Sequence, residues 1–317
     1  MTLLYSNDTF LHHETGLHPE SADRIREIPS HLEKAGLDRR CKQPEWEPIP
    51  RHQIARVHSL RYVDEVWAMA KSGGGDLDVD TVCSPSSYDV ALRAAGCVSD
   101  ASQRILGGED NQALCLVRPP GHHALASRAM GFCLFNNVAI AAKAAVDEMG
   151  LDRVLIVDWD IHHGNGTQAT FWEDPRVGFF SIHRCPFFPG TGMEDETGSG
   201  DGLGATLNLP VAFGISRKDY LALFGLGLER FAAKIKPQLI FISAGWDTHR
   251  LDPVGNLGLE VEDYATMTNM VLDIADSYCG GKLISVLEGG YDPRIVAESV
   301  VVHLDEMLKR QESRAES

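Results

Sequence analysis

Short apolar runs alternate along the chain with longer segments whose apolar residues recur every three or four positions. Five of the runs are continuously apolar and bounded by polar or glycine-rich segments. This pattern is typical of strands that are buried on both faces of a parallel sheet. The predicted strands are Ala113–Arg118, Val154–Asp160, Val177–His183, Leu239–Gly245 and Lys282–Glu288.

The segments between these runs have helical spacing. Two apolar stripes consist of Val138, Ala142, Ala145 and Met149, and of Tyr264, Met267, Val271, Ile274 and Tyr278. Ser86–Leu106 and Tyr220–Ile235 are also predicted helices, and Pro293 suits the first turn of a final helix that ends near Lys309. The alternation predicts an α/β fold with an open, mostly parallel sheet sandwiched by helices. No linker or repeat divides residues 1–317, so we expect a single domain.

The composition narrows the classes of partner. Acidic residues number 45 against 29 lysines and arginines, and the net charge of −16 repels nucleic-acid phosphates and could attract cationic substrates. Seven cysteines without a Cys-x-x-Cys pair fit a reducing compartment, and no signal peptide or membrane-length apolar run is apparent. We therefore expect a cytoplasmic protein without a nucleic-acid or membrane partner. The oligomeric state stays open, and a homo-oligomer is compatible with the sequence.

Each predicted strand runs directly into a segment that is rich in polar residues or glycine. These segments are Arg118–Ala124, Asp158–Gly166, Ser181–Arg184, Ser243–His249 and Leu287–Asp292. In an open parallel sheet, ligands bind at the carboxyl ends of the strands. We therefore expect the segments to converge on one site, although they lie far apart in the sequence.

Two of these segments predict a metal site. Residues two apart in an extended segment point the same way, so Asp158, Asp160 and His162 share one side. Asp247 arrives from the end of another strand. Two carboxylates and one imidazole with an open fourth position are typical of a catalytic zinc, although Fe²⁺ or Mn²⁺ accept the same donors. An Asp-x-His pair alone would indicate only a capped loop turn.

Two other segments carry groups suited to proton transfer and to an oxyanion. His122 and His123 are adjacent, and taken alone the pair indicates one exposed and one packed histidine. Beside a metal-activated water, histidine titrates in the range that amide hydrolysis requires of a base and an acid. Tyr291 follows Gly289 and Gly290, which let the backbone turn sharply, and its hydroxyl could hydrogen-bond a tetrahedral oxyanion.

The ordered set of motifs resembles the histone deacetylase family, in particular its class II branch and the bacterial histone deacetylase-like amidohydrolases. The resemblance extends over nearly the whole chain and implies the arginase–deacetylase fold. The motifs that carry it are His18–Ser21, Val57–Ser59, Tyr62–Val63, Arg118–Ala124, Gly131–Cys133, Asn136–Asn137, Val157–Gly166, Phe188–Gly192, Ser243–Asp247 and Glu288–Tyr291.

The resemblance also implies a role for each candidate residue near the metal. His123 would be the general base and acid, and His122 would be its electrostatic partner, held by Asp158. Asn165 stands where class I members carry an aspartate, which supports the class II branch and would leave His123 less strongly oriented towards its charged form. Tyr291 would polarise the acyl carbonyl. The zinc ligands would be Asp160, His162 and Asp247.

Further residues of the resemblance concern the substrate and a second ion. Phe132 and Phe188, with Gly131 beside them, would wall a narrow tunnel for the aliphatic arm of the substrate. Val254 stands where polyamine-specific relatives carry a glutamate, which weakens a dedicated polyamine role. Gly164 stands where an arginase-like second manganese would require an aspartate, so we expect one catalytic metal. The ligands of a structural potassium would be Asp158, Ser181 and the backbone of Asp160, His162 and Ile182.

These features together predict zinc-dependent hydrolysis of acyl-lysine, carrying an acetyl or other short acyl group, in proteins or peptides. An acetylpolyamine amidohydrolase with the same residues is the nearest alternative. A catalytically idle acyl-lysine binding protein and a manganese ureohydrolase are more remote alternatives. The preferred acyl length, the physiological substrate and the choice between zinc and iron stay open.

Overall fold

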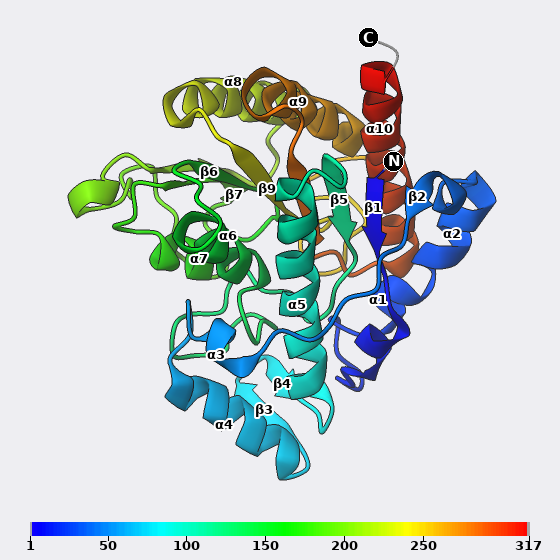
Figure 1. Cartoon of the computed structure of the whole chain (residues 1–317), viewed down its shortest axis with the longest axis vertical. Coiled ribbons are helices and arrows are strands. Elements are labelled where there is room, and N and C mark those ends of the chain that lie inside the picture. Colours follow the sequence, from blue (N-terminus) through cyan, green and yellow to red (C-terminus); the bar gives the residue numbers. More distant parts are fainter. Residues whose placement is uncertain (1, 316–317) are drawn as a thin grey trace.

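A parallel eight-stranded sheet forms the centre of the computed structural model, which describes residues 2–315 (Figure 1). The strand order is β2-β1-β5-β10-β9-β6-β7-β8, and all neighbouring strands run parallel. The strands are β1 Thr2–Tyr5, β2 Cys41–Lys42, β5 Gln112–Cys115, β6 Val154–Asp158, β7 Val177–Arg184, β8 Thr206–Val211, β9 Leu239–Ala244 and β10 Leu283–Leu287. The predicted α/β fold with an open parallel sheet is therefore confirmed.

The five strands predicted from apolar runs are β5, β6, β7, β9 and β10. All residues of β5, β6, β9 and β10 are buried, because helices cover both faces of the sheet and both faces therefore require apolar side chains. The prediction placed Asp160 within a strand, but β6 ends at Asp158 and Asp160 lies in the loop beyond it. The strands β1, β2 and β8 were missed, because β1 and β2 are short and β8 is an edge strand that is only partly buried.

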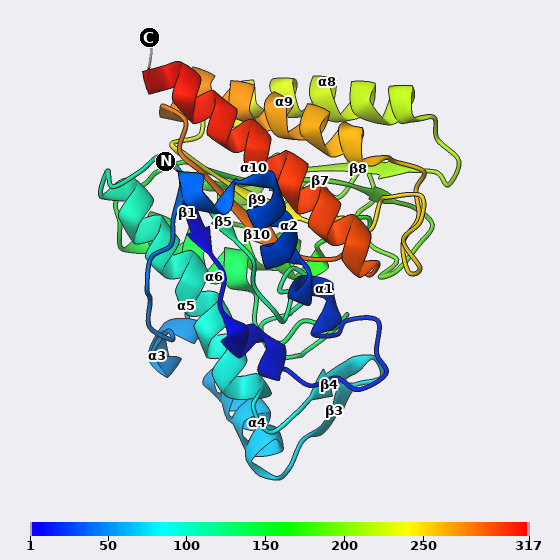
Figure 2. The same cartoon turned by 90° about the vertical axis from the view of Figure 1, so that its right-hand side faces the viewer.

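Helices pack on both faces of the sheet. Figure 2 shows α8, α9 and α10 on one face and α5 and α6 on the other. The helices of eight or more residues are α2 Ile28–Ala35, α4 Leu60–Lys71, α5 Ser87–Leu106, α6 Asn137–Asp147, α8 Arg217–Ile235, α9 Val261–Cys279 and α10 Pro293–Ala315. The shorter ones are α1 Asp23–Arg26, α3 Arg51–Ile54, α7 Asn165–Thr170 and the 3-10 helices η1 Asp8–His12, η2 Asp38–Arg40 and η3 Gly200–Gly202.

One further pair of strands lies outside this core. A separate antiparallel hairpin, β3 Gly75–Asp78 with β4 Thr81–Cys83, lies beside α4 (Figure 1). Within residues 2–315, no helix has the length and apolar character needed to cross a membrane.

Three predicted helix ends differ from the structure, each for a local reason. Helix α8 begins at Arg217 rather than Tyr220, because the Ser216 side chain caps it by accepting the Asp219 N–H. Helix α6 ends before Met149, whose N–H bonds back to the last turn just before a left-handed glycine. Helix α10 continues past Lys309 to its end at residue 315, and ion pairs from its last turns to α9 support the extension.

The topology brings the chemically interesting loops together. The strands β5, β10, β9, β6 and β7 are consecutive neighbours in the sheet and all point the same way. The five segments that follow them therefore leave the sheet at the same edge, as the strand-end pattern predicts.

Candidate metal centre and active site

Three buried side chains form a cluster of potential metal ligands at this edge. Asp160 and His162 lie in the loop after β6, and Asp247 lies just after the neighbouring strand β9. His162 Nδ1 is 2.9 Å from Asp160 Oδ1 and 3.2 Å from Asp247 Oδ2. One ligand atom of each residue falls within 4.8 Å of the other two. The structure thus brings together the three residues that the sequence predicts as zinc ligands.

The donor set and its electrostatics fit a cation. Asp247 Oδ2 is buried and accepts no hydrogen bond, although His162 Nδ1 lies 3.2 Å away. Burial and the neighbouring Asp160 raise the pKa of Asp247 to about 7, because two carboxylates share a dry site. Burial lowers the pKa of His162, but Asp160 and Asp247 outweigh it and raise the value to about 9. A divalent cation would relieve the repulsion between the Asp160 and Asp247 carboxylates. Two oxygen donors with one nitrogen donor are a ligand set of catalytic zinc sites.

Backbone groups hold the two carboxylates in place. Asp160 Oδ2 accepts the Gly289 N–H at 2.8 Å, and Asp247 Oδ1 accepts the Ile161 N–H at 2.9 Å. A Cβ on Gly245 would collide with the Asp160 carboxylate, and a Cβ on Gly289 would collide with both carboxylates. The glycines are therefore required by the close approach of the backbone to the cluster.

The tandem histidines face different partners. His122 Nδ1 lies 3.0 Å from Asp158 Oδ2, and His123 Nδ1 lies 2.7 Å from Asn165 Oδ1. Burial lowers the pKa of His122, but Asp160 and Asp158 outweigh it and raise the value to about 10. Burial together with the cations at His122 and His162 holds the pKa of His123 well below its usual range. The environment thus shifts the pKa values of the two adjacent histidines in opposite directions, which favours the charged form of His122 and the neutral form of His123.

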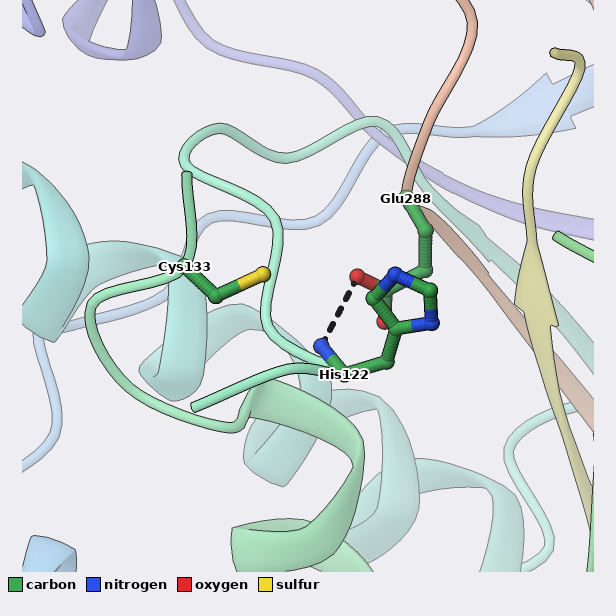
Figure 3. Close-up of side chains that lie close together, drawn as sticks. All are labelled: His122, Cys133 and Glu288. Carbon is green, nitrogen blue, oxygen red and sulfur yellow. Dashed lines mark hydrogen bonds between the residues drawn. The ribbon is translucent and has the colours of Figure 1, made fainter. Parts of the chain in front are cut away.

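A second group of potential ligands, His122, Cys133 and Glu288, lies beside the first (Figure 3). Figure 3 shows the Glu288 carboxylate against His122, with the Cys133 side chain directed towards both. Glu288 Oε2 accepts the Gly121 N–H at 2.7 Å and the His122 N–H at 3.2 Å. Burial raises the pKa of the Cys133 thiol well above its usual value, so the sulfur keeps its proton. The group therefore fits a support for the histidine segment better than a metal site.

Aromatic side chains surround the histidines and Tyr291. The Phe188 ring meets the His123 ring edge-on at 5.2 Å, and the Phe132 ring meets Tyr291 edge-on at 5.7 Å. A Cβ on Gly131 would collide with the His123 ring, so this glycine lets the loop pass close to the histidine. Phe188 is 39% exposed and thus lies at the surface of the site.

The Tyr291 backbone is fixed by a carboxylate that also reaches the Val254 loop. Asp252 Oδ2 accepts the Tyr291 N–H at 2.7 Å, and Asp252 Oδ1 accepts the Val254 N–H at 2.9 Å. The Arg24 guanidinium lies 4.9 Å over the Tyr291 ring. Tyr291 and Val254 therefore belong to one linked region of the site.

The residues predicted for a potassium ion also lie close together. Asp158 and Ser181 are register partners in β6 and β7, and Ile182 follows Ser181. Ser181 Oγ lies 2.9 Å from His183 Nδ1. A Cβ on Gly164 would collide with the Asp158 carboxylate, so an aspartate at this position would have to displace the Asp158 side chain.

Two contacts of the site were not predicted from the sequence. The Phe187 ring stacks on the His162 imidazole, with centroids 5.1 Å apart and planes inclined by 17°. Arg24 reaches the carbonyls of Glu288 and Gly290 from the first helix. The only sequence signal for Phe187 was its place beside Phe188, and no local pattern points from Arg24 to a loop so distant along the chain.

A buried network of ion pairs connects α1 to the loop that follows β5. Glu20 contacts Arg24 at 3.0 Å and Arg118 at 2.7 Å, and all three side chains are fully buried. His13 Nε2 lies 3.5 Å from the same carboxylate. Burial raises the pKa of Glu20, but Arg118 outweighs it and holds the pKa well below its usual range. The carboxylate is thus the counter-charge of two buried guanidinium groups.

We expect Glu20→Gln to lower the free energy of unfolding by about 3–5 kcal/mol at pH 7, because it leaves buried cations without their counter-charge. Since the folded pKa is depressed, the contribution is complete above the unfolded value of 4.5 and falls at lower pH. The gap between wild type and variant should then shrink by up to about 1.4 kcal/mol per pH unit. Urea unfolding at several pH values measures it.

The matched control for this prediction is Glu262→Gln, an exposed carboxylate 3.7 Å from Arg217. Its effect on the free energy of unfolding should stay within about 0.5 kcal/mol. A Glu20→Gln protein as stable as the control at pH 7 would contradict the role given to the network.

Comparisons with known proteins agree with the geometry. The family described as the histone deacetylase domain matches residues 18–307. A probable deacetylase of Archaeoglobus fulgidus is 37% identical over 291 residues, covering 91% of this chain and 80% of the relative. A histone deacetylase-like amidohydrolase of Pseudomonas aeruginosa is 37% identical over 284 residues, covering 88% of this chain and 74% of the relative. The crystal structure of the HDA15 HD domain superposes with a TM-score of 0.92 at 37% identity, covering 97% of this chain and 88% of that one.

A parallel sheet flanked by helices, with polar loops gathered at the carboxyl ends of its strands, is here the arginase–deacetylase fold. The chain belongs to the histone deacetylase family. The deacetylase and amidohydrolase names of its relatives support a hydrolase.

Proposed function

We propose that this protein is a zinc-dependent deacylase that removes an acetyl or other short acyl group from the side chain of acyl-lysine in peptides or proteins. The observation that carries the proposal is the buried cluster of Asp160, His162 and Asp247, with one carboxylate oxygen that accepts no hydrogen bond. Two histidines with opposed pKa shifts lie next to this cluster and supply the groups that amide hydrolysis requires.

Asp160, His162 and Asp247 would hold the zinc ion. When bound, the ion supplies Lewis acidity to the acyl oxygen and makes a neighbouring water easier to deprotonate. His123, which its low pKa keeps in the neutral form, accepts a proton from the attacking water and returns that proton to the leaving amine. The water oxygen bonds to the acyl carbon, the C–N bond breaks, and a short carboxylic acid departs. His122 stays charged through Asp158 and stabilises the negative charge that develops.

Tyr291 would donate its hydroxyl hydrogen bond to the acyl oxygen as that atom gains charge. Burial raises the pKa of Tyr291 well above its usual value, so the phenol keeps the proton it donates. Phe132 and Phe188 would flank the methylene chain of the lysine, with Gly131 keeping the space beside His123 open. Asn165 would orient His123 without adding a charge.

A structural potassium would take Asp158, Ser181 and the carbonyl oxygens of Asp160, His162 and Ile182 as ligands. The support is the register that pairs Asp158 with Ser181 on adjacent strands. Oxygen donors of this kind suit a hard monovalent cation, which would also offset part of the negative charge of Asp158 and Asp160.

Tyr291→Phe is expected to reduce kcat about 10²–10³-fold, the usual cost of removing one oxyanion donor, while zinc content stays at the wild-type value. Steady-state kinetics on an acetyl-lysine peptide, together with metal analysis of the same samples, measures both quantities. The matched control is Tyr278→Phe on the outer side of α9, which should leave both unchanged. Near-full turnover by the Tyr291 variant would remove this residue from the mechanism.

The substrate class is tested with a panel of acyl-lysine peptides, acetylputrescine and acetylspermidine on the zinc-loaded protein. Val254, which brings no negative charge to the site, leads us to expect at least about tenfold higher kcat/KM on the peptides. Preference for the polyamines would overturn the substrate class while leaving the chemistry intact. Tight binding of acyl-lysine without hydrolysis would overturn the enzymatic proposal, and urea release from arginine with manganese would replace it.

A further inference from the structure

A column of four side chains leads from the surface to the proposed ligand His162. The Arg184 guanidinium lies 4.5 Å over the Phe213 ring and 4.2 Å over the Phe187 ring. Phe187 in turn stacks almost flat on the His162 imidazole, at 5.1 Å and 17°. The order of contacts is therefore Phe213, Arg184, Phe187 and His162.

The parallel register of β7 and β8 assembles this column. Arg184 is the last residue of β7 and pairs with Val211, the last residue of β8. The Cys185 N–H donates to the Val211 carbonyl at 2.8 Å and continues the ladder by one step. Phe213 lies two residues beyond Val211, and Phe187 lies three beyond Arg184, so both rings meet the same guanidinium.

The arginine has few polar partners among the described residues. Its Nη1 donates to the Gly255 carbonyl at 3.2 Å, and its buried Nε has no hydrogen-bond partner. Cation–π contacts attract the guanidinium to both aromatic faces and offset part of the cost of the Nε that donates to no acceptor. The contact with Arg184 also explains why an aromatic residue stands at position 213, although Phe213 is 63% exposed.

The stacked Phe187 ring lies where it can restrict the χ2 torsion of His162, which sets the direction of the imidazole nitrogens. The χ2 angle of histidine is broad when nothing holds it, because rotation about an sp³–sp² bond has low barriers. Here the imidazole must present Nδ1 to Asp160 and Asp247 at 2.9 and 3.2 Å. The Phe187 ring lies nearly parallel to the imidazole, with the centroids 5.1 Å apart, so a rotation about χ2 would have to displace it.

We propose that Phe187, clamped by Arg184 and Phe213, is a positioning residue that keeps the His162 imidazole in the orientation required to hold the metal. The inference rests on the metal site of the proposed function. Its consequence is kinetic: a ligand that cannot rotate away lets a bound ion escape less often, so loosening the column should speed metal release. Substitution of a residue that supports a metal ligand typically lowers the metal affinity 10–100-fold.

The test is the rate of zinc release from zinc-loaded protein into an excess of chromophoric chelator. Phe187→Leu should release zinc about 10–100-fold faster than wild type. Phe213→Ala and Arg184→Gln, which change the outer part of the column, should accelerate release by a smaller factor. Phe213 is largely exposed, so its variant will fold and keeps the inference testable if the Phe187 variant does not.

Two matched controls separate positioning from general loosening. Phe188→Leu removes the neighbouring ring, which meets His162 edge-on at 6.1 Å, and should lower kcat/KM without faster zinc release. Phe231→Leu removes a buried ring from α8 and should lower the thermal midpoint without faster release. Equal acceleration by Phe231→Leu and Phe187→Leu, or a wild-type rate of zinc release from all three column variants, would overturn the inference. Wild-type protein that takes up no zinc would instead refute the proposed function itself.

Discussion

Replacing Asp247 with asparagine is expected to lower zinc affinity by more than about 100-fold, since changes outside the ligand set alone cost up to that factor. The amide keeps the shape of the side chain but removes one of the two negative charges that face His162. Turnover of an acetyl-lysine peptide should fall with zinc occupancy. Competition against a chelator of known zinc affinity measures the change.

The same substitution is expected to stabilise the metal-free protein. Burial and Asp160 raise the pKa of Asp247 from 3.8 to about 7, so ionisation of this carboxyl destabilises the folded state; the loss grows as the pH rises above 3.8 and is complete above about 7. At pH 8 metal-free Asp247→Asn should therefore unfold at a higher urea concentration than metal-free wild type. A site that loses stability to gain function is the usual signature of a functional cluster.

Asp263→Asn is the matched control for both effects. Asp263 is a buried carboxylate that caps α9 and pairs with Arg217, away from the metal cluster. Its substitution should leave zinc affinity unchanged and should lower, not raise, stability. Wild-type zinc affinity in the Asp247 variant would remove this residue from the ligand set.

Replacing His123 with alanine is expected to lower kcat about 10²–10⁴-fold, the range for loss of a general base and acid, while zinc binding is retained. The expectation follows from the neutral form that burial imposes on His123 and from its hydrogen bond to Asn165. Metal analysis and steady-state kinetics on the same samples separate a chemical effect from loss of zinc.

Chemical rescue sharpens this second prediction. Added imidazole should restore part of the turnover of the His123 variant, because the space left by the side chain lies beside Gly131 and the partly exposed Phe188. It should not restore Tyr291→Phe, which lacks a different group. A His123 variant with near-wild-type turnover would show that another residue moves the proton.

Much of the fold could be predicted because its central strands are buried on both faces. Continuous apolar runs result directly from that burial, as in β6 and β9, where every residue is buried. The strand ends then predicted the grouping of Asp160, His162 and Asp247, since parallel neighbours deliver their loops to one edge. These inferences need only local pattern and the direction of the strands.

Other features depend on contacts that no local pattern encodes. Edge strand β8 alternates buried and half-buried residues and contains Pro210, so its apolar signal was weak. The Phe187 stack on His162 depends on the register of β6 against β7, and the Glu20 network depends on the approach of α1 to the strand ends. Such contacts form only when the whole sheet is assembled.

The zinc dependence of turnover is the most direct test of the account. Metal-free protein is titrated with Zn²⁺ while acetate release from an acetyl-lysine peptide is followed. Activity should rise in proportion to added zinc and break at one equivalent, with no break for Asp247→Asn. Full activity in metal-free protein, or a break at two equivalents, would contradict a single ion held by Asp160, His162 and Asp247.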